Sequence, residues 1–239
     1  MTIISEIAPD LYRISVYVPV LDLQFNHFLV RDRAPLLFAT GLRGLFPTLR
    51  EAVALLIDPT RLSWLAFSHF EADECGALNE WLDLAPDARP LCGIGSATVN
   101  VDDWALRPAR SLASEEVIAT GRRRFRFLAT PHLTHAWDTG MLFEETDRTL
   151  LCSDLFFQEG NPAPLTGDPV GPALAALRRP APSPFAGMPV AAGSGGTLLK
   201  MLAALAPQTI AVAHGASFAG DGAQVIRQLH MELPSAPAW

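Results

Sequence analysis

The chain has 239 residues, a length that suits one domain and suffices to bury a large core. Hydrophobic residues make up 49% and charged residues only 18%, which excludes an intrinsically disordered protein. Lys and Arg number 18 against 25 Asp and Glu, and the net charge is -7. No basic run occurs, so we expect neither nucleic acid nor an anionic membrane as a partner, because both need cationic patches.

The cysteines and the first residues limit the class of protein further. Cys75, Cys92 and Cys152 form no C-x-x-C pair, which excludes a zinc ribbon or a thioredoxin-type site. The segment Met1–Asp10 has neither the basic start nor the long apolar run of a signal peptide. No uncharged apolar run approaches the roughly 18 residues that span a bilayer. We therefore expect a cytoplasmic protein.

Strands and helices alternate in the first part of the chain. Apolar and β-branched runs predict strands, and apolar residues at helical spacing predict helices. The predicted strands are Leu11–Val20, Phe25–Val30, Pro35–Ala39, Ser63–Phe67 and Pro90–Ile94, and the predicted helices are Thr48–Ile57 and Gly76–Leu84.

The second part continues this alternation with one long interruption. Short apolar runs and turns fill Val101–Glu145, including Phe125–Ala129. Asn161–Gly196 is dense in Pro, Gly and Ala, which predicts an irregular segment with a short helix at Pro172–Arg178; it is either a flap over a site or a surface loop. The remaining predicted elements are strands Thr149–Ser153 and Thr209–Ala213 and helices Leu198–Ala206 and Gly222–Leu233. No clean linker divides the chain, so we expect one domain over residues 1–239.

Chemistry concentrates in residues 68–76, called the acidic loop from here on. It follows a predicted strand and carries His69, Glu71, Asp73 and Glu74. Carboxylates this close raise one another's pKa, and a bound metal removes that penalty. The alternative is a solvated acidic start of the next helix, where carboxylates favour the helix dipole.

Further metal-competent side chains follow later strands. His132 and His135 come after one strand, Asp154 ends another, and His214 with Gly215 ends a third. The carboxyl ends of strands are where an α/β sheet presents its chemistry. Each of these residues alone is weak support for a site, but their coincidence in this order indicates one.

This order resembles the metallo-β-lactamase fold. More narrowly, it is similar to the diiron domain of flavodiiron proteins and related oxygen-binding diiron proteins. Hydrolases of the superfamily carry H-x-H-x-D-H, whereas the flavodiiron branch carries H-x-E-x-D-H. This chain has His69-x-Glu71-x-Asp73-Glu74, with Glu74 where the motif has His. The resemblance implies an α/β fold (α+β in some schemes), a four-layer αββα sandwich with two mixed sheets.

The resemblance also implies a ligand set. His69, Glu71 and His135 would hold one metal, Asp154 would bridge, and Asp73 with His214 would hold the second. Glu74 is open: it could ligate, act behind the ligands, or leave a position to water. Glu74 and His132 are the candidate catalytic residues. His27 is interpreted as an ordinary strand residue, with the alternative that it reaches the pocket, and Asp138 as a residue that could orient a ligand histidine.

The donor set favours iron among the possible metals. Four carboxylates and three imidazoles form an oxygen-rich set, which suits iron or manganese better than the thiolate or imidazole sets favoured for zinc. A carboxylate-rich site also offsets the charge gained when Fe(II) is oxidised. Zinc or manganese remains an alternative, because carboxylate-rich hydrolases exist.

The leading hypothesis is a non-haem diiron protein that binds or reduces dioxygen or nitric oxide. The chain leaves no room for a flavodoxin domain, so we expect no FMN within it and an external electron-donor protein. A homodimer is expected by analogy with the family. The rival is a metal-dependent hydrolase of the same fold, in which a metal-bound hydroxide attacks an ester, thioester or phosphoester. A third interpretation is a metal-poor scaffold that binds a partner.

Overall fold

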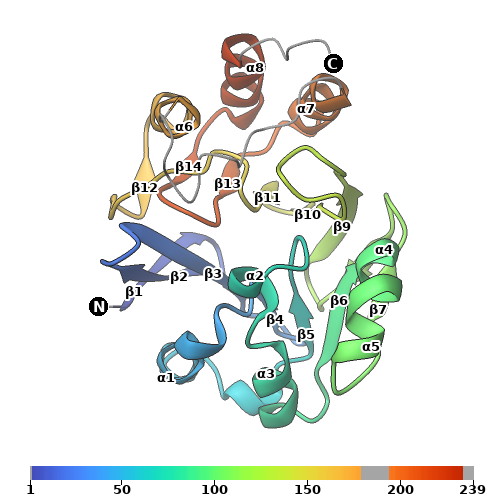
Figure 1. The fold of residues 1–239 in the computed structure, drawn as a ribbon. Helices are drawn as coiled ribbons and strands as arrows, with labels where there is room; N and C mark the ends of the chain where they lie inside the picture. The colour runs from blue at the N-terminus through green and yellow to red at the C-terminus, as the bar shows by residue number, and fades with distance from the viewer. Residues whose placement is uncertain (1, 179–193, 234–239) are drawn as a thin grey trace.

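The computed structural model describes residues 2–178 and 194–233. Within these residues the strands form two seven-stranded sheets that pack face to face, with helices on the two outer sides. In Figure 1 the first sheet and its helices lie below, and the second sheet lies above, under α6, α7 and α8. The four-layer αββα sandwich expected from the sequence is therefore confirmed.

The first sheet is built from the first half of the chain. β1 to β4 pair antiparallel, whereas β4 to β7 run parallel, so the sheet is mixed. Parallel neighbours need crossover connections, and helical segments separate each pair from β4 to β7 in the chain. The strands are β1 Thr2–Ala8, β2 Leu11–Val18, β3 Leu23–Val30, β4 Leu36–Phe38, β5 Trp64–Ala66, β6 Arg89–Gly93 and β7 Arg110–Leu112.

The second sheet is also mixed and is built from the second half of the chain. Its order is β12-β14-β13-β11-β10-β9-β8, and β11 pairs parallel with β13. The ends of β11 and β13 therefore lie side by side, which brings Asp154 and His214 to the same edge. The strands are β8 Val117–Ala119, β9 Arg124–Ala129, β10 Gly140–Glu144, β11 Thr149–Leu151, β12 Leu165–Thr166, β13 Thr209–Ala211 and β14 Ser217–Ala219.

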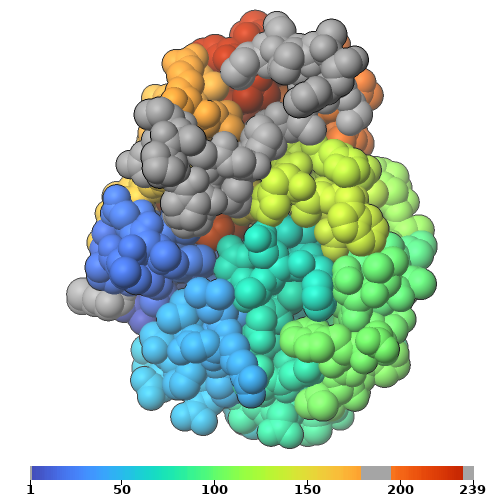
Figure 2. All heavy atoms as spheres, viewed as in Figure 1, coloured from blue at the N-terminus to red at the C-terminus, as the bar shows by residue number. Residues whose placement is uncertain are grey.

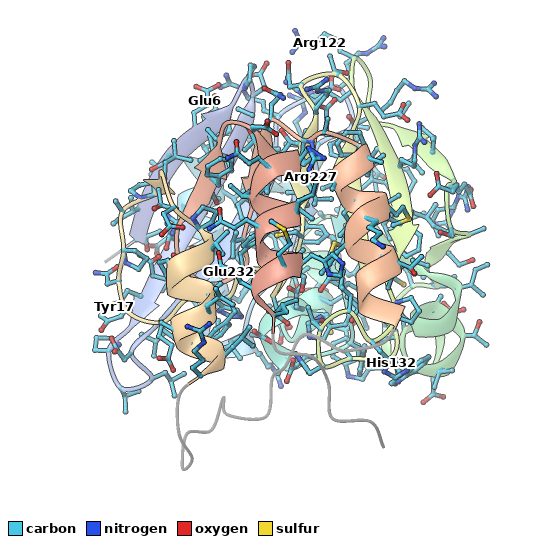
Figure 3. The ribbon with its side chains drawn as sticks, turned by 90° about the horizontal axis from the view of Figure 1, so that it is seen from above. Glu6, Tyr17, Arg122, His132, Arg227 and Glu232 are labelled. Carbon is cyan, nitrogen blue, oxygen red and sulfur yellow. The ribbon has the colours of Figure 1, made fainter. Side chains whose placement is uncertain are left out.

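Helices cover both outer faces. Figure 3 looks down on α6, α8 and α7 side by side over the second sheet. Short 3-10 turns occur at Arg43–Leu45 and Pro59–Arg61, and a π turn occupies Ala97–Val101. The helices are α1 Phe46–Ala54, α2 Ala72–Cys75, α3 Leu78–Leu84, α4 Ile94–Ser96, α5 Asp102–Trp104, α6 Val170–Leu177, α7 Ser194–Ala204 and α8 Gly222–Glu232.

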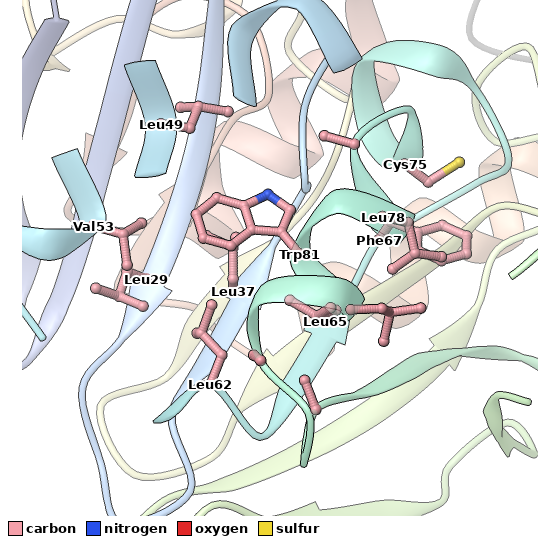
Figure 4. Close-up of a cluster of buried hydrophobic side chains, with 14 of the residues drawn as sticks. Leu29, Leu37, Leu49, Val53, Leu62, Leu65, Phe67, Cys75, Leu78 and Trp81 are labelled. Carbon is pink, nitrogen blue, oxygen red and sulfur yellow. The ribbon is translucent and has the colours of Figure 1, made fainter. Parts of the chain in front are cut away.

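Trp81 is the centre of the core beneath the first sheet. Its indole is fully buried among side chains of α1, α3 and the sheet, including Leu37, Leu49 and Val53 (Figure 4). The indole N–H donates to the carbonyl of Thr40 at 3.1 Å, so the one polar atom of the ring is satisfied. This cluster fixes α3, and with it the segment that leads out of the acidic loop.

The structure differs from the predicted elements in several places, and the short strands β12 and β14 were not predicted. β1 is an additional edge strand, and the segment Ile94–Trp104 is helical. The predicted helix Gly76–Leu84 begins only at Leu78, after the separate one-turn α2. The predicted helix at Pro172–Arg178 is confirmed as α6, whereas residues 179–193 of the segment interpreted as a flap or loop lie outside the described residues. Across the described ranges, no helix is long and apolar enough to cross a membrane. The assignment of one domain stays a prediction.

Candidate metal centre

Loops from both sheets meet at one edge of the sandwich. The acidic loop follows β5, His135 lies between β9 and β10, and Asp154 and His214 follow β11 and β13. Figure 2 shows the segment that contains the acidic loop, coloured teal, at the surface beside the yellow-green segment around residues 130–140. Six of the seven ligands expected from the sequence are linked there by a chain of short contacts.

His69, Glu71 and His135, called the first half of the site, form its tightest group. Oε2 of Glu71 lies 2.8 Å from Nε2 of His69 and 2.7 Å from Nε2 of His135. The His69 ring is buried, whereas 48% of the Glu71 side chain is exposed. One ligand atom from each residue lies within 4.8 Å of the other two, so these residues could hold a metal ion.

Asp73 and His214, called the second half of the site, lie across Asp154 from the first. Nε2 of His214 is 3.1 Å from Oδ2 of Asp73 and 3.4 Å from Oδ1 of Asp154. The other oxygen of Asp154, Oδ2, is 3.7 Å from Nε2 of His69 and 3.6 Å from Nδ1 of His135. Asp154 therefore faces both halves, one oxygen to each.

The two oxygens of Asp154 test whether these residues fit a metal pair. Both are buried, and neither has a hydrogen-bond partner in the described part of the chain. A buried polar atom without a partner loses its full solvation, a cost of about 1–3 kcal/mol and more for a charged group. Nδ1 of His135 is buried and unpartnered in the same way. Cations on both sides of Asp154 would satisfy these atoms, so the donor set fits two metal ions.

The orientation of His214 supports this fit. Its Nδ1 lies 2.9 Å from the carbonyl oxygen of Gln24, which can only accept, so Nδ1 carries the proton and donates. The lone pair of Nε2 then points toward Asp73 and Asp154. Metal-binding histidines are usually held this way, by a second hydrogen bond that fixes the tautomer. The next residue, Gly215, has φ +97°, and a Cβ there would lie 2.5 Å from Cβ of Gln158, so only glycine fits after this histidine.

Protons occupy the histidines when no cation is bound. Burial opposes protonation of His69, but the hydrogen bond to Glu71 and the charge of Asp154 raise its pKa to about 9. Burial likewise opposes protonation of His214, and Asp154 and Asp73 raise its pKa to about 10. The hydrogen bonds from His135 and His69 hold the pKa of Glu71 well below its usual range. The site thus attracts positive charge, and a metal must displace protons from it.

Glu74 lies behind the first half of the site. Its carboxylate is fully buried and accepts from the backbone N–H of Ser68 at 3.1 Å and from Oγ of Ser153 at 3.2 Å. Oγ of Ser68 donates to Oγ of Ser153 at 2.5 Å and lies 2.7 Å from Nδ1 of His69. Burial raises the pKa of Glu74 to about 7. Of the three roles left open for Glu74, these contacts support the one behind the ligands; its catalytic role stays a prediction.

His132 and Asp138 have other surroundings than His135. His132 is exposed, at the end of the molecule opposite Arg122 (Figure 3). No hydrogen bond or ion pair between described residues joins its ring to the cluster, and its role in catalysis stays a prediction. Asp138 accepts from the backbone N–H of Phe70 at 3.0 Å. It therefore holds the acidic loop itself, where we expected it to orient an imidazole.

His27 was interpreted as an ordinary strand residue, and the structure places its ring beside the second half of the site. Its Nδ1 lies 2.9 Å from the carbonyl oxygen of Ala39, while its Nε2 is buried without a hydrogen-bond partner among the described residues. Burial lowers its pKa to about 4, so the ring is neutral. The available signal was the run Leu23–Val30, in which every position is buried; a histidine in such a strand must face other protein atoms on either side.

The paired mixed sheets, with a histidine and carboxylate cluster at one edge, define a protein of the metallo-β-lactamase fold. A family model described as "ODP family beta lactamase" matches residues 23–163, more than half of the chain. The chain belongs to this family.

The sequence is also similar to curated proteins, at no more than 28% identity in either of two matches. A putative diflavin flavoprotein A 1 from Nostoc sp. PCC 7120 is 28% identical over 135 residues, which cover 55% of this chain and 23% of that protein. Rubredoxin-oxygen oxidoreductase from Megalodesulfovibrio gigas is 25% identical over 139 residues, 56% of this chain and 34% of that protein. The matched part thus spans about a quarter to a third of these relatives. They are named as flavoproteins or an oxygen oxidoreductase, so they do not favour the hydrolase alternative.

Solved structures support the fold over nearly the whole chain. Rubredoxin oxygen:oxidoreductase from Desulfovibrio gigas superposes with a TM-score of 0.80 and 20% identity over 96% of this chain and 61% of that one. The flavodiiron protein from Giardia intestinalis gives 0.77 and 14% identity over 97% of this chain and 59% of that one. A fragment of putative diflavin flavoprotein A 5 from Nostoc sp. PCC 7120 gives 0.75 and 13% identity, with 96% and 95% covered. The resemblance to the flavodiiron fold is therefore confirmed.

Proposed function

We propose that this chain is a non-haem diiron protein that binds or reduces dioxygen or nitric oxide. The first half of the site would hold one iron, the second half the other, and Asp154 would lie between them. Zinc is the less suitable occupant, because the donor set is rich in carboxylate oxygen, and manganese is the alternative metal.

The single observation that carries the proposal is the pair of orphaned oxygens on Asp154. Each oxygen faces a different group of donors, at 3.4 to 3.7 Å from imidazole nitrogens. A buried carboxylate without hydrogen-bond partners among the described residues needs positive charge beside it, and metal ions on both sides would supply that charge. This arrangement suits a dinuclear centre better than a single ion.

The protein's own groups would position and neutralise the pair. When bound, two ferrous ions supply the electrons that dioxygen or nitric oxide accepts. Glu71, Asp73 and Asp154 offset the positive charge gained on oxidation. Gln24 and Ser68 hold the His214 and His69 rings through their Nδ1 atoms, which limits the reorganisation of the ligands.

The electron source and the assembly are part of the proposal. The name of one relative, rubredoxin-oxygen oxidoreductase, contains both a protein, rubredoxin, and oxygen. By that likeness we propose an electron-donor protein as a partner of this chain and a homodimer as its assembly. The exposed carboxylate of Glu71 is the point where the site approaches the surface, so a small gas or a docked donor would approach from this side.

Anaerobic loading with Fe(II), followed by dioxygen, tests the proposal. We expect about two iron ions per chain, oxygen uptake, and a new absorption band of oxidised iron. His230→Ala, which changes a histidine on α8, is the matched control and should behave as the unaltered chain. A chain that takes up fewer than two ions, or that leaves oxygen unconsumed after loading, would refute the diiron function.

A further inference from the structure

His27 lies outside the family motif, and its Nε2 atom is buried without a hydrogen-bond partner among the described residues. We propose that His27 is a further metal ligand, a nitrogen donor to the second half of the site. The inference rests on the pair of cations proposed above, and it concerns how this chain holds the second of them.

The position of the ring is the first argument. His27 lines a small cavity together with Asp73, Glu74 and His214, and Phe25 and Ala39 also line it. The cavity measures about 10 Å³. That is room for a single ion or water molecule and for no organic ligand.

The chemistry of the facing atoms is the second argument. Nδ1 of His27 donates to the Ala39 carbonyl, so Nε2 of the neutral ring carries a lone pair. Asp73 lines the same cavity, and its carboxylate is also an acceptor when ionised. Acceptor groups that line one small cavity repel each other, and a cation bound among them would convert the repulsion into coordination.

The balance of donors between the halves is the third argument. Besides Asp154, the first half has two imidazoles and one carboxylate, whereas the second has only Asp73 and His214. The family motif would supply a histidine from the acidic loop, but this chain has Glu74 there, and the Glu74 carboxylate is engaged by Ser68 and Ser153. His27, from β3, would restore a nitrogen donor from another part of the chain.

The surrounding backbone makes room for this ring. Gly41 has φ +87°, and a Cβ at this position would lie 2.7 Å from Cε1 of His27. Ala39 supplies the carbonyl that fixes the tautomer. In the described residues only the first half of the site has three ligand atoms within 4.8 Å of one another. The second half must therefore contract on loading, and Asp73, on the one-turn α2 and partly exposed, is its most movable member.

Anaerobic Fe(II) titration of the full chain and of His27→Phe tests the inference, with bound iron measured by equilibrium dialysis. Phenylalanine replaces the ring without a donor nitrogen. We expect the unaltered chain to bind two equivalents. The variant should bind the first equivalent normally and the second more than about tenfold more weakly. Equal affinity for the second equivalent in both proteins would overturn the role of His27 while leaving the diiron function standing. Failure of the unaltered chain to bind a pair would instead refute that function.

A measurement on the unaltered chain removes the dependence on how the variant folds. The chain has six histidines, and long-range nitrogen-15 NMR of the Zn(II)-loaded, histidine-labelled protein identifies each metal-bound ring nitrogen. We expect four bound imidazoles: those of His69, His135 and His214, together with His27. An Nε2 resonance of His27 unchanged by Zn(II), with the other three shifted, would overturn the proposal.

Discussion

Buried carboxylates occur at both ends of the sandwich, and they are treated in opposite ways. At the end near Arg122, the Asp32 side chain is 1% exposed and accepts from the backbone N–H groups of Arg33, Arg122 and Arg123 and from Oγ1 of Thr120. At the other end, Asp154 is 5% exposed and has no such donor in the described residues. Both side chains are buried to a similar degree, so burial alone does not distinguish a structural carboxylate from a functional one.

Glu144 strengthens the contrast. It is fully buried, accepts from the backbone N–H groups of Thr146 and Asp147, and lies 3.3 Å from the guanidinium of Arg123. The protein therefore supplies donors where a carboxylate has only to be stable. At the candidate metal centre it supplies acceptors instead, and leaves the positive charge to come from solution. The distribution of donors, more than the number of acids, locates the site.

The largest expected effect is the loss of metal binding in Asp154→Ala. Removal of the carboxylate that faces both halves should weaken Fe(II) binding by at least about 100-fold for both equivalents, because neither half then has its shared donor. The unaltered chain should gain about 2.7 kcal/mol of stability with free metal at 100 times its Kd. This corresponds to a rise in Tm of roughly 5–10 °C. The variant should show no such rise, and a metal-dependent Tm in Asp154→Ala would remove the contrast between the two ends.

The second effect is a rise of metal affinity with pH. Because the pKa values of His69 and His214 are raised to about 9 and about 10, both rings are protonated near neutral pH in the metal-free chain. Metal binding must release those protons, so affinity should rise by roughly tenfold per pH unit for each proton displaced, up to the raised pKa values. Calorimetric titration between pH 6 and 8 in buffers of different ionisation enthalpy counts the protons. Affinity that is independent of pH in this range would contradict the expectation.

The third effect is a loss of stability without loss of metal in Asp32→Ala. Four donors lose their acceptor, which should cost about 1–3 kcal/mol of unfolding free energy. Although burial opposes it, these hydrogen bonds hold the pKa of Asp32 below its usual value. The stabilisation is therefore present above the unfolded pKa and is lost as pH falls through the lower folded pKa. Denaturant unfolding should show the two proteins converging in strong acid, while Fe(II) stoichiometry at neutral pH stays the same.

The smallest effect is that of Arg122→Ala. The Arg122 side chain is 72% exposed and pairs with Asp10 at 3.0 Å and, more weakly, with Asp32 at 3.9 Å, whereas the hydrogen bond from its backbone N–H to Asp32 survives the change. An exposed ion pair contributes at most about 1 kcal/mol and is screened by salt. Unfolding at low and high salt measures it. A loss as large as that of Asp32→Ala would mean that the side-chain pairs, and not the backbone donors, stabilise this end.

The sequence predicted much of the fold because its periodic segments are also its core segments. The helix at Thr48–Ile57 and the strand at Phe25–Val30 correspond to α1 and β3, each within two or three residues at its ends. The break between α2 and α3 was not predicted. The composition of Cys75, Gly76 and Ala77 is compatible with a helix, so the sequence does not mark the point where α3 begins. β1 was missed, since an edge strand with one buried position carries little apolar signal.

The sequence was sufficient to name the candidate ligands, but it did not predict the hydrogen-bond partners of the buried polar side chains. The order of His69, Glu71, Asp73, His135, Asp154 and His214 along the chain sufficed to expect them at one edge, because each follows a strand. Three of the four donors to Asp32, in contrast, lie about 90 residues away in the chain, and no local pattern connects them. The free Nε2 of His27 depends on a ring rotamer fixed by Ala39 and Gly41, which only the three-dimensional arrangement reveals.

The division of the two sheets between consecutive halves of the chain has a practical consequence. Every strand of the first sheet precedes residue 113, and every strand of the second follows residue 116, so one cut between β7 and β8 would separate the sheets without breaking either. His69, Glu71 and Asp73 would remain on one piece, and His135, Asp154 and His214 on the other. Two co-expressed pieces should therefore reassemble through their shared apolar interface. Bound iron, held by ligands from both pieces, should strengthen their association, and a chelator should weaken it.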